Sequence, residues 1–199
     1  GHWLTLEAMA LRRSPLNLAP TSRDDFWQEN AAFEAEVRFG ETWSLRGRAD
    51  GEAFQYRQQD SVLFFDQALL RFQLGPRVQP GLGWSVWAGP RFERLSSALQ
   101  PAEAYREIGG AAEIGIFLGQ SWWSLAPAAG LRDYDDPSGG ALPGIHSSFV
   151  FTELQAFGDQ PIAAGLRLRL FATARFEDHD DSTQDARSLY FSFDVRRLF

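Results

Sequence analysis

The feature that most constrains this chain is a strict alternation of apolar and polar residues over long segments. In residues 31–39, AAFEAEVRF, one row contains Phe33 and Val37, and the other row contains Glu34 and Arg38. A period of two indicates a β-strand, because successive side chains of a strand point to opposite faces. A helix would scatter the same charges around its axis. The chain is therefore expected to fold into β-structure with two chemically different faces.

Ten segments show this alternation. They are residues 3–11, 31–39, 42–54, 62–74, 82–94, 105–118, 121–132, 147–157, 162–177 and 188–199. Many exceed the five or six residues of an ordinary soluble strand, and about 9–11 tilted residues suffice to cross a bilayer. The least regular segment is 147–157, where Phe149 and Phe151 share a row with Glu153. We expect one domain over residues 1–199, either a mature chain or a fragment of a longer one.

The connections between these segments alternate in length. The short ones lie near Gly40-Glu41, 75–81, Gly119-Gln120 and 158–161, and the longer ones near 12–30, 55–61, 95–104, 133–146 and 178–187. Short turns on one side and long loops on the other are typical of outer-membrane barrels. The sequence therefore predicts an all-β fold, an up-and-down antiparallel transmembrane β-barrel of about ten strands.

Aromatic residues gather at the ends of the predicted strands. The chain contains 17 Phe and 7 Trp, and aromatic residues make up 14% of it. With the short turns on one side, the residues that cluster at that end, nearly all on the apolar row, are Trp3, Phe39, Trp43, Phe72, Trp84, Phe117, Trp123, Phe157 and Phe199. We interpret them as an interfacial aromatic girdle.

The last predicted strand, LYFSFDVRRLF, ends on Phe199. It resembles the C-terminal signal of Gram-negative outer-membrane barrels, a final strand of alternating aromatic and apolar residues that closes with Phe. The resemblance implies a location in the bacterial outer membrane and recognition by the barrel-assembly machinery. It also implies contact with the lipid bilayer, lipopolysaccharide and other envelope proteins. Arg197 departs from the pattern, but an arginine near a strand end can snorkel to the interface.

The polar rows carry interleaved charges of both signs. The residues expected to face a barrel lumen are Glu34, Glu36, Arg38, Arg46, Arg48, Arg71, Arg91, Glu93, Glu107, Glu113, Glu153, Arg167, Arg169, Arg175 and Asp194. Enclosed charges are tolerated when they are paired and hydrogen-bonded. We expect a cross-strand salt-bridge network that fills the lumen, with a narrow polar channel for small solutes as the alternative.

Composition excludes several function classes. The net charge of −7 argues against a nucleic-acid partner, since phosphate binding requires a basic face. The absence of cysteine excludes disulfides and thiolate metal sites. With no phosphate-binding loop or zinc spacing, we expect no cofactor and no metal. The expected role is that of an envelope scaffold, a narrow porin-like pore, or the membrane-embedded component of a transport or secretion assembly, and not that of an enzyme.

Two alternatives stay open. The spacing of His146 and Ser148 resembles the His-x-Ser arrangement of the outer-membrane lipid A deacylase, although Glu153 lies on the opposite row. The acidic run around His179 is similar to the Asp/His pairs of omptin-type surface proteases, which need a second acidic pair from another loop. Either resemblance implies a surface-facing hydrolase. The other alternative is a soluble β-barrel that encloses its apolar rows and binds an apolar ligand.

Overall fold

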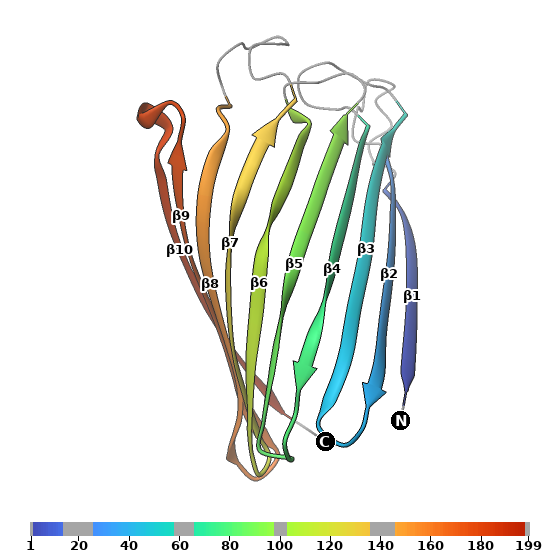
Figure 1. Ribbon diagram of the computed structural model, residues 1–199, viewed down its shortest axis with the longest axis vertical. Helices are drawn as coiled ribbons and strands as arrows, with labels where there is room; N and C mark the ends of the chain where they lie inside the picture. The colour runs from blue at the N-terminus through green and yellow to red at the C-terminus, as the bar shows by residue number, and fades with distance from the viewer. Residues whose placement is uncertain (1, 14–25, 58–65, 98–102, 136–145, 198–199) are drawn as a thin grey trace.

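The computed structural model describes residues 2–13, 26–57, 66–97, 103–135 and 146–197. These residues form one antiparallel ten-stranded sheet in which each strand pairs with its neighbours along the chain (Figure 1). The strands are β1 Trp3–Arg13, β2 Phe26–Phe39, β3 Trp43–Tyr56, β4 Gln67–Val78, β5 Trp84–Ser97, β6 Tyr105–Leu118, β7 Ser121–Tyr134, β8 Phe149–Ala163, β9 Leu166–His179 and β10 Ala186–Arg197. The predicted all-β, up-and-down arrangement of ten strands is confirmed.

The short connections all lie at one end of the sheet. They span residues 40–42, 79–83, 119–120 and 164–165, and the strand ends that the longer connections join lie at the opposite end of the sheet (Figure 1). Gly40, Gly119 and Gly165 have φ angles of 86°, 61° and 72°. These three turns therefore use glycine for left-handed backbone that other residues rarely adopt.

Two short turns lie later in the sequence than predicted. The turn expected near residues 75–81 lies at 79–83, because β4 continues to Val78, and the turn expected near 158–161 lies at 164–165, because β8 continues to Ala163. Gly158 pairs with Trp123 across the ladder, and a Cβ at Gly158 would lie 2.4 Å from the Trp123 ring. This glycine leaves space for a cross-strand indole instead of marking a turn.

Close backbone approach at facing glycines bends the sheet. A Cβ at Gly75 would lie 2.0 Å from the carbonyl oxygen of Ala88, and one at Gly109 would lie 2.2 Å from that of Ala129. Glycine in a strand often marks such a bend or close approach. The curvature brings Arg46 of β3 within 3.6 Å of Glu113 of β6, although β4 and β5 separate these strands.

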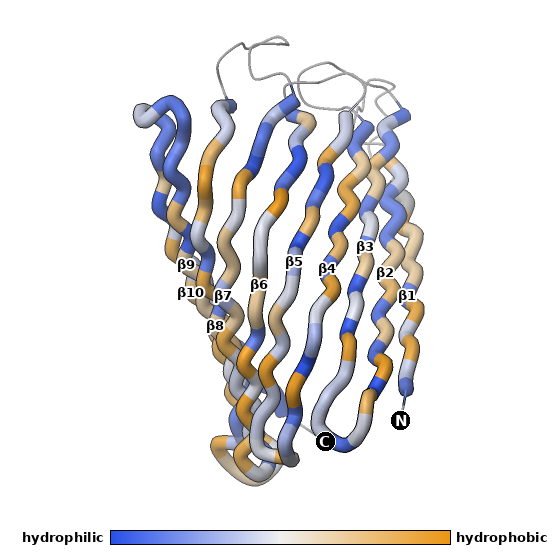
Figure 2. Tube along the Cα trace, in the orientation of Figure 1, coloured by the Kyte–Doolittle hydropathy of each residue, from blue (hydrophilic) through white to orange (hydrophobic). Residues whose placement is uncertain are grey.

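The two faces of the sheet differ in chemistry and in exposure. Paired residues share a face, and the face of Glu36, Glu93 and Glu107 (the ionic face) holds the buried side chains. The opposite face (the apolar face) exposes large hydrophobic side chains such as Ile108 and Leu154. Figure 2 shows the resulting alternation along the strands. The curled sheet thus encloses charge and presents hydrocarbon outward, the reverse of an ordinary soluble core.

In the described structure, the first strand and the last strand form the two edges of the sheet. Within the part of the chain that the structure describes, β1 pairs only with β2 and β10 pairs only with β9. Most side chains of both strands are exposed on both faces. Among these residues no helix is both long enough and apolar enough to span a bilayer.

Candidate functional site

The most enclosed part of the ionic face is a cluster around two carboxylates. Glu107 accepts hydrogen bonds from Arg132 Nε and Nη2 at 3.1 and 2.7 Å, and Arg91 Nη2 lies 3.0 Å from its other oxygen. Glu93 accepts a hydrogen bond of 2.7 Å from the hydroxyl of Tyr105. We call these five residues the ionic core. Its buried charges are tolerable because each carboxylate forms ion pairs with both Arg91 and Arg132.

Aromatic rings complete the surroundings of the ionic core. The guanidinium of Arg132 lies 3.9 Å above the Tyr105 ring, and that of Arg175 lies 4.4 Å above the Phe151 ring. Phe149 and Phe151 are both buried on the ionic face. The irregular alternation in residues 147–157 thus has a physical reason, since cation–π contacts place these two rings among arginines.

Strands β2 to β4 carry arginines that contact carboxylates on the ionic face. Arg38 Nε lies 3.4 Å from the buried Glu36, while Arg48 and Arg71 both contact Asp50, at 3.2 and 3.0 Å. We use the name arginine wall for Arg38, Arg46, Arg48 and Arg71. The side chains of Arg38, Arg48 and Arg71 are more exposed than the carboxylates that they contact.

The strand register places all residues predicted to line a lumen on the ionic face. They are Glu34, Glu36, Arg38, Arg46, Arg48, Arg71, Arg91, Glu93, Glu107, Glu113, Glu153, Arg167, Arg169, Arg175 and Asp194. Sequence reasoning misses the part that Asp159 has in this network, because the sequence pattern predicts a turn at residues 158–161. Asp159 is buried and accepts hydrogen bonds from Arg167 and Arg169.

The structure separates the two residues of the predicted His-x-Ser pair. His146 Nε2 lies 3.0 Å from a carboxylate oxygen of Glu103, whereas the Ser148 hydroxyl donates a hydrogen bond of 3.0 Å to Asp133. The described contacts therefore do not support the alternative in which His146 serves as a base for Ser148. The two side chains contact different partners, Glu103 before β6 and Asp133 in β7.

A different serine and histidine meet at the same end of the sheet. Ser147 Oγ lies 3.0 Å from His179 Nδ1, and His179 Nε2 lies 3.4 Å from Glu177. The Ser147 hydroxyl also lies 3.3 Å from the amide oxygen of Gln184, which competes for its hydrogen. No sequence spacing pointed to this group, because residues from β9 and from the segment before β8 meet through the long-range hairpin pairing.

The acidic run after β9 has a local structural role. Asp181 accepts hydrogen bonds from the amide and the hydroxyl of Thr183 and caps the short 3-10 helix Ser182–Gln184. These hydrogen bonds lower the pKa of the Asp181 carboxyl. Among the described residues, no group of three or more histidine and carboxylate side chains has the arrangement of a metal site.

Five predicted girdle residues lie on the apolar face, and three do not. Phe39, Trp43, Phe72, Trp84 and Trp123 share the apolar face, although Phe72 pairs with Phe92 in mid-strand. Trp3, Phe117 and Phe157 pair with residues of the ionic face, so these three are exceptions to the placement of the girdle on the apolar row. Phe199 lies outside the described residues.

The three misplaced aromatics have identifiable surroundings. Phe117 and Trp122 stack with centroids 6.3 Å apart, and Phe157 lies 4.9 Å from Trp122. These rings form an aromatic cluster on the ionic face, near the short turns. Trp3 lies in a segment whose two rows both contain apolar residues, so alternation alone did not fix its orientation.

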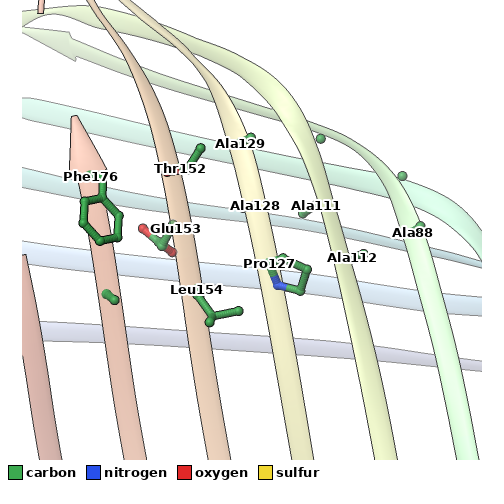
Figure 3. Close-up of a pocket in the computed structure, with 13 residues that line it drawn as sticks. Ala88, Ala111, Ala112, Pro127, Ala128, Ala129, Thr152, Glu153, Leu154 and Phe176 are labelled. Carbon is green, nitrogen blue, oxygen red and sulfur yellow. The ribbon is translucent and has the colours of Figure 1, made fainter. Parts of the chain in front are cut away.

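The apolar face contains a hollow of about 620 Å³ over β5 to β9. Figure 3 shows alanines and Pro127 along it, together with Leu154 and Phe176. Of its lining residues, Thr152 and Glu153 carry polar side chains, and Glu153 is bound by Arg175 at 3.0 Å. The hollow presents almost entirely hydrocarbon, so the polar chemistry of the protein lies on the other face.

Comparison of the chain with known protein families, curated proteins and solved structures found no match.

Proposed function

We propose that the sheet closes into a ten-stranded barrel in the bacterial outer membrane and serves as a narrow pore. The observation that carries this proposal is the reversed burial. Glu107 is fully buried, whereas Leu154 on the opposite face is 43% exposed. Exposed hydrocarbon and enclosed charge suit a bilayer outside and a polar lumen inside. The same observation argues against a soluble barrel that encloses its apolar rows.

The register supports closure between β1 and β10. Crossing the ladders directly from Thr5, near the start of β1, leads through one partner in each strand to Ala186, the first residue of β10. The strands are thus strongly staggered, as closure of a tilted barrel requires. If Glu7 pairs with Arg196, the register at the closing pair is offset along β10 by about twelve residues from Ala186, the residue that the ladders place level with Thr5; we call this offset the step.

A step of about twelve residues corresponds to a strand tilt that is usual for β-barrels. About twelve residues of ~3.4 Å over ten strand spacings of ~4.8 Å correspond to a tilt of about 40°, within the usual range. The step keeps Glu7 and Arg196 on the ionic face, and Ala8 and Val195 on the apolar face. A step of about ten residues would instead oppose Glu7 to Asp194, and like charges across a pair are unfavourable.

The ionic core and the arginine wall lie on different strands around the proposed lumen. Strands β5 to β7 carry the ionic core, and Arg175 of β9 over the Phe151 ring of β8 extends it, so that these side chains fill one side. Strands β2 to β4 carry the arginine wall, whose side chains are more exposed than the arginines of the ionic core. A barrel of about this size is nearly filled by side chains, so the passage left beside the wall is narrow.

A location in the outer membrane implies contact with the barrel-assembly machinery, the lipid bilayer and lipopolysaccharide. The terminal segment LYFSFDVRRLF resembles the signal read by the barrel-assembly machinery, and the apolar face fits acyl chains with lipopolysaccharide at the loop end. A role as scaffold or as the membrane part of a transport assembly would use the same barrel without the passage. A hydrolase would now depend on Ser147, His179 and Glu177, where Gln184 competes for the serine hydroxyl.

Planar bilayers distinguish a pore from a filled barrel. We expect the purified protein, refolded in detergent, to produce discrete conductance steps when added to a bilayer in KCl. The steps should be small because the ionic core obstructs part of the lumen. A control preparation unfolded in urea should produce none. A folded, inserted protein that leaves the bilayer conductance unchanged would contradict the pore and favour a scaffold.

A further inference from the structure

The arginine wall exposes positive charge while its carboxylates are covered. Arg48 and Arg71 have side chains 54% and 43% exposed, and the Asp50 carboxylate that both contact is 19% exposed. Arg38 is 42% exposed beside Glu36, which is 1% exposed. Arg46 and its partner Glu34 are about equally exposed, at 27% and 26%, so the excess of accessible positive charge along this wall comes from Arg38, Arg48 and Arg71. The wall is therefore electropositive in a chain of net charge −7.

The acidic groups of the ionic face do not cancel this asymmetry. Glu93 and Glu107 are buried beneath arginines, and Glu113 is 35% exposed near Arg46. Glu7 and Asp194 are the more exposed acids, and they lie on the edge strands β1 and β10. Both are therefore separated from the middle of the arginine wall.

A small pocket beside the wall contains an unsatisfied donor. It has a volume of about 60 Å³ and is lined by Arg46, Arg48, Gln73, Trp87 and Glu113. Trp87 is 7% exposed, and its Nε1 has no hydrogen-bond partner in the described structure. Leaving a buried donor unpaired costs about 1–3 kcal/mol. A ligand atom that relieves this cost must be an acceptor, because an indole N–H can only donate.

The pocket has the donors that an anion requires. Arg48 pairs directly with Gln73 across the β3–β4 ladder, so a guanidinium and a side-chain amide line the pocket together with the Trp87 indole, while the Glu113 carboxylate lies 3.6 Å from Arg46. The volume corresponds to about two water molecules, which fits a small anion or one carboxylate group of a larger solute. Guanidinium groups bind carboxylates well, with shorter and stronger hydrogen bonds than neutral donors give.

We propose that the enclosed space is an anion path and that the pocket of Arg46, Arg48, Gln73, Trp87 and Glu113 is its binding station. The expected ligands are chloride and small carboxylates. This inference rests on the proposed pore for conduction, whereas binding at the station does not require a conducting state.

Reversal potentials in a KCl gradient test the direction of selectivity. We expect the protein to favour chloride over potassium, and Arg48→Gln to reduce the chloride-to-potassium permeability ratio at least threefold. Arg106→Gln is the matched control, because it removes the same charge from the apolar face, where Arg106 pairs with Asp133. It should leave the ratio unchanged. A pore that favours potassium, or equal effects of the two variants, would overturn the anion path but leave the pore in place.

Chloride binding is measured separately on the detergent-solubilised protein. We expect the chloride-35 NMR line to broaden with the protein, and Trp87→Phe to remove most of the excess width because it deletes the donor but keeps a ring. If conductance is absent but this broadening is present and lost in Trp87→Phe, the binding station stands and the pore fails. If broadening is the same in the parent protein and in Trp87→Phe, the station is refuted.

Discussion

Replacing Glu107 by alanine is expected to destabilise the protein by about 3–5 kcal/mol, the cost of breaking a buried ion pair. The Glu107 side chain is fully buried, and its two oxygens face Arg132 and Arg91. Removing the carboxylate leaves both guanidinium groups enclosed, with Glu93 as their nearest remaining carboxylate. Urea unfolding of the protein reconstituted in lipid vesicles measures this loss.

The matched control is Asp194→Ala, which also removes a carboxylate from the ionic face. The Asp194 side chain is 51% exposed, and its partner Arg196 is 56% exposed. An exposed pair contributes about 1 kcal/mol or less. We therefore expect a loss several times smaller than that of Glu107→Ala. Equal losses for the two variants would show that the ionic core is solvated, contrary to the enclosed arrangement described above.

Cysteines placed on β1 and β10 are expected to cross-link almost completely if the two edges pair. The proposed step sets Ala8 opposite Val195, and directly opposite Cβ atoms lie about 4.5–5.5 Å apart, near enough for a disulfide after small adjustments. The chain has no native cysteine, so Ala8→Cys with Val195→Cys gives a clean background. Oxidation in vesicles followed by denaturing electrophoresis without reductant measures the linked fraction as a band of altered mobility.

Two further pairs make the cross-linking test specific. Leu6→Cys with Val195→Cys reports a step of about ten residues, because it shifts the register by two. Ala88→Cys with Val195→Cys places the second cysteine on the apolar face of β5, several strands from β10, and should give little product. If neither the Ala8 pair nor the Leu6 pair cross-links, β1 and β10 do not close on each other.

Most of the fold follows from local sequence patterns. Alternation in segments such as residues 31–39 fixed the strands and the chemistry of each face, because the strand period is two and does not depend on the partner. The unequal connections fixed the up-and-down order. Turn positions were less certain. Gly158 was read as a turn residue, yet it lies within β8 to accommodate Trp123, a partner that only the register reveals.

The candidate site was predictable in composition but not in contacts. Alternation identified Glu107 and Arg91 as members of one face, but which arginine binds which carboxylate depends on register and curvature. The Ser147–His179 contact joins residues 32 positions apart, so the spacing of His146 and Ser148 was misleading. The unsatisfied Trp87 N–H is invisible in sequence, since its burial results from packing across several strands.

Spin labels on two neighbouring residues of β9 test the orientation of the faces most directly. Ala172 pairs with Phe191 on the apolar face, and Thr173 pairs with Tyr190 on the ionic face. With cysteine-linked nitroxides at each position in lipid vesicles, we predict that the label at 172 collides mainly with oxygen, which concentrates in the bilayer. The label at 173 should collide mainly with a water-soluble nickel chelate. Preferential collision of the 172 label with the nickel chelate would contradict the outward orientation of the apolar face and the bilayer assignment that depends on it.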